Sequence, residues 1–586
     1  MDFSPPAAKS CLNCRTRKVK CDKRIPVCRR CVSNDLSCSY KSGEIDPKRF
    51  RSSRACQSCR MQKRRCSGGL PKCSRCLKFR YPCFYISSHS LLSNIDIKEF
   101  YAEIDSDRYH QLVIELVGNT LSKNLQFLAG NFLDTDKLIL DVHSRTQPKI
   151  LTQALVGMSL DSVDSELEEW WFDKHLSDIL SNLQQIELTL FVSLLLNVLW
   201  TWAKRARRNF FVVPLLCRMA FSLLLHLEEL VRPATLLESE LRRRMMWNCF
   251  LLDKLVAAGL PELTCCDLSV LRDLKLPSDV VGQDGGYFCL ENMGLRSNTP
   301  VVPIGMLAFS AHLGQLRHLT LTYGRSADTN LDRWWLTDSM IKCIDRDLHG
   351  LLKKLPPELK YSKHNLLNRP STSESWFFLV SHLWVHQIFC DLYRLAIPGM
   401  RESSPEIILS LIPQELLAQA QSDCLRHAVA ICDIICDNLE FINSVKSIGD
   451  ILTFMQQSAR LILVYVQQQQ NININFTLED TDIARFLNCI LSILLLDGAR
   501  NLPQTRIICH FIVNSCNQLE LHNEVPLLSK ASALKLPTEE EHQAELAFLP
   551  VFAAREKISP ATLRNNTTLE DTYMPGEYLD YFFKFN

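Results

Sequence analysis

The chain has 586 residues, 47% of them hydrophobic, and a formal net charge of +2, which is typical of a mostly globular protein with several domains. The charge is uneven, because residues 1–85 hold 22 Lys and Arg against 5 Asp and Glu, a net charge of +17, and the remainder has a net charge of −15. The opening MDFSPPAAKS has no apolar stretch, and the longest uncharged run, Leu188 to Ala203, is shorter than the ~20 residues of a membrane span, so neither secretion nor membrane insertion is expected.

The basic head has the charge of a polyanion-binding module, and the acidic remainder is expected to have a different partner. Within the head, six cysteines recur with identical spacing 45 residues later, which predicts a duplicated module rather than scattered thiols. Twelve closely spaced cysteines without a secretion signal favour metal binding in a reducing compartment, with disulfides as the alternative. The two sets are Cys11, Cys14, Cys21, Cys28, Cys31 and Cys38, then Cys56, Cys59, Cys66, Cys73, Cys76 and Cys83.

Six thiolates per module suit a pair of zinc ions. Two tetrahedral zinc ions offer eight coordination positions, and six cysteines fill them if two thiolates bridge the metals. Two independent four-cysteine sites are the alternative, but they leave four of the twelve cysteines unused. Each module spans 28 residues, too few to bury a core, so zinc is expected to supply the folding free energy. The count predicts four zinc ions in total.

The strings CLNCRTRKVKCDKRIPVCRRCVSNDLSC and CQSCRMQKRRCSGGLPKCSRCLKFRYPC resemble the fungal binuclear zinc-cluster DNA-binding domain and match its cysteine spacing throughout. The resemblance implies that the first and fourth cysteines of each module bridge the metals, namely Cys11 and Cys28, then Cys56 and Cys73. It also implies a short helix whose end enters the major groove of double-stranded DNA.

In that family a lysine on this helix reads a CGG-type triplet, and Lys18 and Lys63 hold the matching positions. A lysine can donate hydrogen bonds to guanine O6 and N7, while neighbouring basic side chains bind phosphates and set the register. The alternative for these charges is a solvated face or a nuclear import signal. The expected phosphate contacts are Arg15, Arg17, Lys20, Arg60, Arg64 and Arg65.

Residues 39–55 separate the modules and include Gly43 and Pro47, which indicates a flexible tether. Fully extended, this tether spans roughly 60 Å, more than the ~34 Å of one DNA turn. The segment after Cys83 has no sustained apolar heptads of the kind that pair two chains. We therefore hypothesise that one chain engages two half-sites, while its oligomeric state stays open.

From about Ile150 to Leu519, helical periodicity with few strand or hairpin signals predicts an all-α body. In ESELRRRMMWNCFLLDKLVAAGLP, apolar residues recur at helical spacing, Glu240 precedes Arg244 by four residues, and Gly259 and Pro261 end the helix. This stretch, with RMAFSLLLHLEEL and LKLPSD, resembles the fungal-specific transcription-factor regulatory domain. Lys254 and Leu260 depart from that family's usual arginines. The recurring apolar residues are Leu241, Met245, Cys249, Leu252 and Val256.

Four other features give further predictions. Leu188 to Ala203 is expected to be a buried helix, and Gln467 to Gln470 a loop between helices. His382 and His386 are four residues apart and could face one metal ion, although core positions are the expected alternative. The C-terminal LEDTYMPGEYLDYFFKFN interleaves acidic and aromatic residues, which fits a disordered activation segment or a docked terminal element.

The predicted fold is mainly α, with two small metal-stabilised binuclear zinc-cluster modules followed by a large all-α regulatory domain. The expected boundaries are a tail at 1–10, modules at 11–38 and 56–83, a linker at 39–55, a linker with leading helices at 84–149, the regulatory domain at 150–530 and a C-terminal segment at 531–586.

The sequence predicts a nuclear, sequence-specific DNA-binding transcription regulator, an activator of a fungal pathway, whose partners are double-stranded DNA and the transcription machinery or co-regulators. No motif of the common hydrolases, metalloproteases or nucleotide-binding enzymes occurs, so no enzyme is expected. The alternative is a zinc-dependent nucleic-acid or protein interaction module that lacks promoter specificity.

Overall fold

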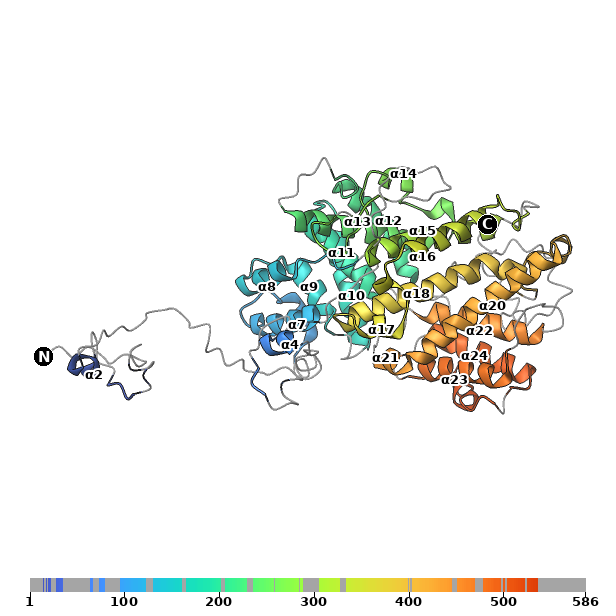
Figure 1. The fold of residues 1–586 in the computed structure, drawn as a ribbon. Helices are drawn as coiled ribbons and strands as arrows, with labels where there is room; N and C mark the ends of the chain where they lie inside the picture. Colours follow the sequence, from blue (N-terminus) through green and yellow to red (C-terminus); the bar gives the residue numbers. More distant parts are fainter. Residues whose placement is uncertain are drawn as a thin grey trace. The chain divides into compact units, whose positions relative to one another are not determined.

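The computed structural model of the chain describes residues 14, 17, 19–22, 28–34, 59, 64–66, 73–79, 95–122, 130–160, 165–201, 206–228, 235–257, 259–283, 285–287, 305–326, 333–398, 400, 403–444, 451–468, 478–496, 499–500, 503–521 and 524–535. The chain forms two units, Met1–Tyr85 and Ile86–Asn586. Among these residues the regular elements are all helices, and the one β-bridge joins Lys275 and Tyr287. The prediction of a mainly α chain, with small cysteine modules before a large helical domain, is confirmed (Figure 1).

The first unit contains two short helices at equivalent positions of the repeat, α2 (Arg29–Ser33) and α4 (Ser74–Phe79). A second backbone feature also repeats, because Val19 N–H donates to Cys14 O at 3.0 Å and Arg64 N–H donates to Cys59 O at 2.9 Å. The buried side chains described in this unit are all cysteines. Since the described part of each module buries no apolar side chain other than cysteine, another source of folding free energy is needed, as a bound metal provides.

The second unit is built from helices. They are α6 (Ile97–Ala102), α7 (His110–Ser122), α8 (Thr135–Ser144), α9 (Lys149–Gly157), α10 (Ser165–Ser181), α11 (Leu188–Thr201), α12 (Ala206–Ser222), α13 (Leu236–Ala257), η2 (Pro261–Leu263), α14 (Leu268–Leu271), α15 (Met306–Ser326), α16 (Met340–Lys354), η3 (Pro357–Leu359), α17 (Lys363–Leu367), α18 (Thr372–Tyr393), η4 (Arg394–Ala396), α19 (Glu406–Leu409), α20 (Gln414–Asp437), α21 (Leu439–Ser444), α22 (Leu452–Gln467), α23 (Asp480–Leu494), α24 (Pro503–Gln518) and α25 (Leu528–Ala531).

These helices pack mainly against others that are near in sequence. Contacts run from α9 to α11, α12, α13, α15, α18, α20 and α22 in turn, so the unit extends from α7–α9 at one end to α20–α24 at the other (Figure 1). One continuous hydrophobic core follows this path from Phe100 to Ala531. The leading helices α6, α7 and α8, which lie within 84–149, share this core with the helices that follow residue 150.

The apolar run expected to be a buried helix is α11, and this prediction is confirmed, since its side chains from Leu190 to Val198 are all buried. Among the described helices, none combines the length and apolar character that crossing a bilayer requires. Gln467 and Gln468 lie at the end of α22, and the rest of the polar tract lies outside the described residues. The C-terminal segment 536–586 also lies outside them.

Helix α13 confirms the predicted apolar face, because Leu241, Met245, Cys249 and Leu252 are buried. The helix ends before Gly259, whose φ of +84° suits glycine. The apolar spacing does not predict a second property of α13, which is that polar and charged side chains on its other faces are buried too: Glu240, Arg243, Asn248, Asp253 and Lys254. Loops and the neighbouring helices α12 and α15 cover this helix, so it is central rather than peripheral.

Candidate metal centres and their surroundings

Three cysteines of the first module converge. Cys14 Sγ lies 3.6 Å from Cys28 Sγ and 4.0 Å from Cys31 Sγ, and all three side chains are buried. A tetrahedral zinc ion with Zn–S bonds of ~2.3 Å places its sulfur ligands about 3.8 Å apart. The Cys14 sulfur is therefore spaced from the sulfurs of Cys28 and Cys31 as zinc ligands are from one another.

Cys28 also belongs to a second group. Its sulfur lies with Cys21 Sγ and an Asp22 carboxylate oxygen in a set whose atoms are all within 4.8 Å of one another. Cys28 is thus common to two groups of potential ligands, which is the position a bridging thiolate requires. The Asp22 carboxylate also accepts hydrogen bonds from Arg29 N–H at 3.1 and 3.3 Å, so it holds the start of α2 beside the sulfurs.

The second module repeats this geometry. Cys59 Sγ lies 3.6 Å from Cys73 Sγ and 3.9 Å from Cys76 Sγ, and Cys66 joins Cys59 and Cys73 in a group within 4.8 Å. These residues correspond to Cys14, Cys28, Cys31 and Cys21 of the first module. The remaining predicted ligands, Cys11, Cys38, Cys56 and Cys83, lie outside the described residues.

Cys73 has the electrostatics of a metal ligand. Burial raises the pKa of its thiol, but hydrogen bonds from Cys76 N–H and from the thiols of Cys76, Cys59 and Cys66 outweigh burial and lower the pKa to about 6. Thiolates are the form in which cysteines bind zinc. The chemistry and spacing of the described donors therefore fit zinc in both modules.

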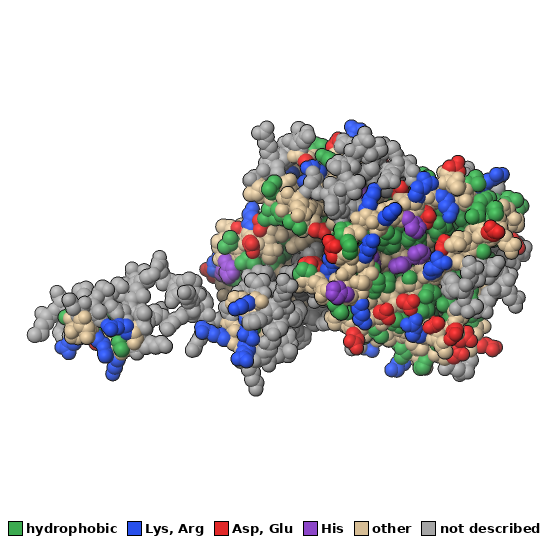
Figure 2. All heavy atoms as spheres, viewed as in Figure 1, with side chains coloured by type: hydrophobic (Ala, Val, Ile, Leu, Met, Phe, Trp, Pro, Cys, Tyr) green, Lys and Arg blue, Asp and Glu red, His purple; other side chains and the backbone are tan. Residues whose placement is uncertain are grey.

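Four of the eight predicted DNA contacts are described, and all four are exposed: Arg17, Lys20, Arg64 and Arg65. Arg15, Lys18, Arg60 and Lys63 lie outside the described residues. Arg29, Arg30 and Lys78, which the sequence analysis did not single out, are also exposed, on α2 and α4. Arg29 directly follows Cys28, Arg30 directly precedes Cys31, and Lys78 lies two residues after Cys76, so these positions could have indicated them. Figure 2 shows these basic side chains in blue on the described parts of the first unit.

In the second unit, the start of α13 carries a buried ionic cluster. Glu240 is 2% exposed and accepts hydrogen bonds from both Arg243 and Arg244 and, at 2.8 Å, from Ser278 N–H. Arg244 also donates to the carbonyls of Asn131 and Ser278, at 2.9 and 2.7 Å. This cluster joins α13 to two segments that are distant in sequence, so its role is structural.

A second polar cluster fixes the end of α13. The Asp253 carboxylate accepts hydrogen bonds from the N–H groups of Cys265 and Cys266, at 2.9 and 3.0 Å, and Lys254 Nζ donates to Cys266 O at 2.7 Å. Burial raises the pKa of Asp253, while those N–H groups and Lys254 partly offset it. Lys254 stands where the resembled family usually has arginine, and here it holds the loop that follows the helix.

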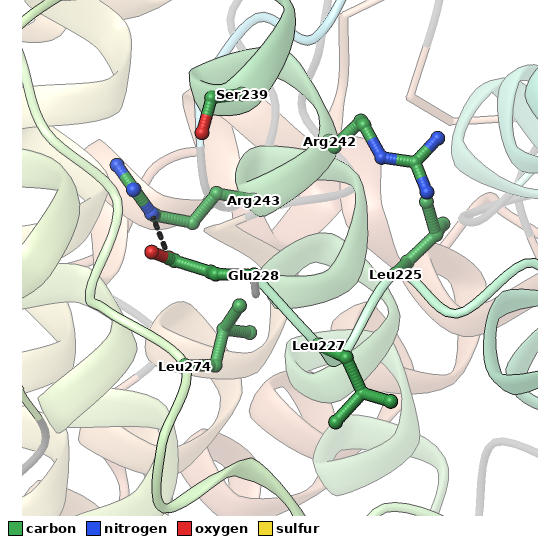
Figure 3. Close-up of a pocket in the computed structure, with 7 residues that line it drawn as sticks. All are labelled: Leu225, Leu227, Glu228, Ser239, Arg242, Arg243 and Leu274. Atoms are coloured by element: carbon green, nitrogen blue, oxygen red, sulfur yellow. Dashed lines mark hydrogen bonds and ion pairs between the residues drawn. The ribbon is translucent and has the colours of Figure 1, made fainter. Parts of the chain in front are cut away.

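A pocket beside α13 is small (Figure 3). Its cavity volume is about 10 Å³, roughly the room of one water molecule, whereas drug-sized ligands usually occupy pockets of ~300–1,000 Å³. Arg243 Nε donates to Glu228 at 2.7 Å and Arg242 to Leu223 O at 3.0 Å. Both guanidinium groups are already paired, so the pocket does not present a free cationic site. It is lined by Leu225, Leu227, Glu228, Ser239, Arg242, Arg243 and Leu274.

The two histidines considered as metal ligands do not share a ligand position. His382 Nε2 lies 2.9 Å from Leu359 O, whereas His386 Nδ1 lies 2.8 Å from His427 Nδ1. Burial lowers the pKa of both His382 and His386 to about 4. Within the described residues, no group of three metal-binding side chains includes either one. Their surroundings favour the core alternative.

Models of known families match the chain in three ranges, which contain both cysteine modules and α13. Residues 9–44 and 54–91 each match the model of the fungal Zn(2)-Cys(6) binuclear cluster domain. Residues 166–316, from α10 to α15, match the fungal specific transcription factor domain, and this range includes all of α13.

Three relatives are similar to parts of the chain. An uncharacterized transcriptional regulatory protein of Schizosaccharomyces pombe is 24% identical over 347 residues, 52% of this chain and 41% of the relative. The transcription regulator galc of Aspergillus niger is 42% identical over 48 residues, 8% of this chain and 5% of the relative. A second such S. pombe protein is 54% identical over 37 residues, 6% of each chain. The chain therefore matches less than half the length of each relative. No solved structure matches the chain.

Proposed function

Because this chain is a fungal zinc-cluster transcription factor, we propose that it binds specific DNA sequences through two modules that each hold two zinc ions. The matched families are transcription regulators rather than enzymes. The observation that carries the proposal is the repeated sulfur geometry, in which Cys14 and Cys59 each lie 3.6 Å from the fourth cysteine of their module. When bound, zinc supplies cross-links that fold the module and does no redox chemistry.

Each module is proposed to use all six of its cysteines. Cys28 supports this proposal, because it is common to two ligand groups and a shared ligand lets six thiolates complete two tetrahedra. By the family resemblance, Cys11 is the second bridge in the first module, and Cys56 and Cys73 are the bridges in the second. The total is four zinc ions for twelve cysteines.

Lys18 and Lys63 are proposed to read a CGG-type triplet in the major groove, by donating to guanine O6 and N7. The exposed Arg17, Lys20 and Arg64 are suited to phosphate contacts, which position the module without reading sequence. The net charge of +17 on residues 1–85 supports DNA as the partner, because phosphate neutralisation supplies most of the affinity for nucleic acid.

The two modules are proposed to engage two half-sites from a single chain. Seventeen residues separate Cys38 from Cys56, and such a tether raises the effective concentration of the second contact. The expected division of the chain into a tail, two modules, a linker and a helical regulatory domain is part of this proposal. The helical unit is proposed to regulate transcription in the nucleus through co-regulators, with activation as the outcome.

Selection of bound sequences from random DNA duplexes tests the proposal. The zinc-loaded full chain should enrich two CGG-type triplets, whereas Lys18→Ala and Lys63→Ala should each relax one triplet. The exposed Lys78→Ala is the control, and it should leave both triplets enriched. Enrichment of no motif, with binding unchanged by either variant, would instead support an interaction module without promoter specificity. Enrichment of one triplet that only one lysine affects would exclude the two-half-site model.

A further inference from the structure

The helical unit buries one arginine that lacks a hydrogen-bonding partner. Three arginines are buried among its described residues, namely Arg243, Arg317 and Arg460. Arg243 donates to Glu228 at 2.7 Å, and Arg460 donates to Gln457 at 2.9 Å. Within the described part of the chain, Arg317 makes no hydrogen bond or ion pair, and its Nε is fully buried. Burying a charged group without a partner is costly, so this position requires an explanation.

Arg317 lies on α15 at its interface with α18 (Figure 1). Its guanidinium carbon is 4.4 Å from the centre of the Trp384 ring, a cation–π contact that holds the side chain in place. Trp384 is partly exposed, so this end of the interface is near the surface. Burial lowers the pKa of Arg317 to about 10, Asp391 opposes this and Arg394 adds to it. The side chain therefore stays a cation at neutral pH.

Asp391, the carboxylate beside this arginine, is already paired. Trp384, Gln387 and Asp391 are three and four residues apart, so they share one face of α18. Asp391 Oδ1 accepts a hydrogen bond from Gln387 Nε2 at 2.9 Å and pairs with Arg394 Nη1 at 3.0 Å. Gln387 is only 1% exposed, and its Oε1 has no donor among the described residues. The interface thus leaves one buried donor, Arg317 Nε, and one buried acceptor, Gln387 Oε1, unsatisfied.

We propose that this interface between α15 and α18 is a binding site for a small hydroxycarboxylate anion. A carboxylate accepts hydrogen bonds from a guanidinium group in a planar arrangement and neutralises its charge. A hydroxyl group on the neighbouring carbon donates to Gln387 Oε1, which an ionised carboxylate alone cannot do. An amino acid fits less well, because its ammonium group would lie close to the guanidinium groups of Arg317 and Arg394.

This site shares no residue with the pocket beside α13, in which Arg242 and Arg243 are both paired. It belongs to the helical unit alone and does not depend on DNA binding by the zinc modules. It gives this unit a ligand of defined chemistry, an anion that carries its own hydrogen-bond donor.

The experiment compares three compounds on the zinc-loaded full chain. Glycolate has both groups, acetate lacks the hydroxyl group, and glycolamide lacks the carboxylate. Far-UV circular dichroism measures the thermal unfolding midpoint over a concentration series of each compound at constant ionic strength. We expect a saturable rise with glycolate, about fivefold weaker binding of acetate, and no shift with glycolamide. A glycolate effect equal to that of acetate or of glycolamide would overturn the proposal.

Variants separate a binding role of Arg317 from a packing role. Arg317→Met should weaken glycolate binding at least about tenfold, because a charged hydrogen-bonded pair contributes most of the affinity. It should itself keep or raise the midpoint, since an apolar side chain replaces an unpaired buried charge. Gln387→Leu should make the effects of glycolate and acetate equal. A lowered midpoint in Arg317→Met with an unchanged glycolate shift would assign Arg317 to packing alone and contradict the proposal.

Arg369→Met is the matched control. Arg369 also lies over an aromatic ring, 4.3 Å from the centre of Phe378, but it donates to Glu358 O at 2.6 Å. Its replacement should leave the glycolate shift unchanged, and loss of the shift in this control would contradict the assignment to Arg317. Each ligand comparison is made within one variant, so it holds even where a substitution lowers stability.

Discussion

Glu240 and Arg244 form an ion pair inside the helical unit, one turn apart on α13, with Arg244 Nε 2.9 Å from Glu240 Oε1. The Glu240 side chain is only 2% exposed, and its oxygens also accept hydrogen bonds from Arg243 and from Ser278 N–H. The Glu240 carboxylate therefore connects α13 to the segment at Ser278 through a buried hydrogen bond. Its removal leaves the buried Arg244 guanidinium without its counter-charge, whereas Arg243 keeps its ion pair with Glu228.

We predict that Glu240→Ala destabilises the helical unit by about 3–5 kcal/mol, the cost of breaking a buried ion pair from one side. The matched control is Glu262→Ala, at an exposed position on η2, which should change stability by about 0.5 kcal/mol or less. Urea unfolding followed by far-UV circular dichroism measures both. Equal effects of the two substitutions would show that the cluster is not a stabilising junction.

A second prediction concerns Gly259, which ends α13. Its φ is +84°, and a Cβ at this position would lie 2.4 Å from Leu321 Cβ and 2.7 Å from the backbone nitrogen of Thr322. Gly259→Ala should therefore cost about 3 kcal/mol or more, because it adds overlap with the α15 backbone to the cost of a left-handed conformation. Thermal unfolding midpoints measure the effect.

Two other glycines separate the cost of steric overlap from the cost of a left-handed backbone conformation. Gly286 has a φ of +70° with open space around its Cβ position, so Gly286→Ala should cost only about 1–2 kcal/mol. Gly350 lies inside α16 with open space and no positive φ, so Gly350→Ala should stabilise the unit by about 0.5–1 kcal/mol. A loss at Gly259 no larger than that at Gly286 would contradict the steric explanation.

A third prediction is a dependence of stability on pH through His175. Its Nε2 donates to Ile150 O at 2.9 Å, and its Nδ1 accepts from Asn197 Nδ2 at 3.1 Å, so both ring nitrogens are satisfied only in the neutral form. Burial lowers its pKa to about 4, Arg208 also disfavours the cation, and Asp178 partly opposes them. The unfolded chain binds a proton near pH 6.5, whereas the folded chain binds it only near pH 4.

The contribution of His175 to the free energy of unfolding should therefore be complete above about pH 6.5. It should fall by about 3 kcal/mol as the pH is lowered to about 4. His175→Gln is expected to flatten this slope, although it lowers stability at neutral pH. His364→Gln, at an exposed position, should keep the wild-type slope. Urea midpoints between pH 4 and pH 7 measure the slopes, and a His175→Gln profile parallel to that of the wild type would exclude the mechanism.

The fourth prediction is a zinc count. If Cys28 is a shared ligand, Cys28→Ser should reduce the zinc content from four ions per chain to two, because the whole first module loses its metal. Elemental analysis of the purified chain gives this number directly. Cys509→Ser removes a buried thiol of the helical unit and should leave four ions. A content of three ions in Cys28→Ser would mean that the two metals of a module bind independently.

The cysteine modules were predictable from sequence because metal ligands follow fixed spacings along one short segment. The helical character of the second unit was predictable too, since apolar residues such as Leu241 and Met245 recur at helical spacing. Periodicity could not show that Glu240 and Asp253 are buried on the same helix, because each accepts a hydrogen bond from a backbone N–H group beyond the helix, that of Ser278 or Cys266.

The absence of an apolar core among the described residues of the cysteine modules has a consequence for their response to zinc supply. Ordering such a segment costs conformational entropy, and the first metal contacts must offset that cost. Because Cys28 belongs to two groups of potential ligands, binding of the first ion also places ligands for a second ion. Uptake within one module should be cooperative, so that falling free zinc empties and unfolds it over a narrow concentration range. With the tether between them, the two modules can cross this threshold separately.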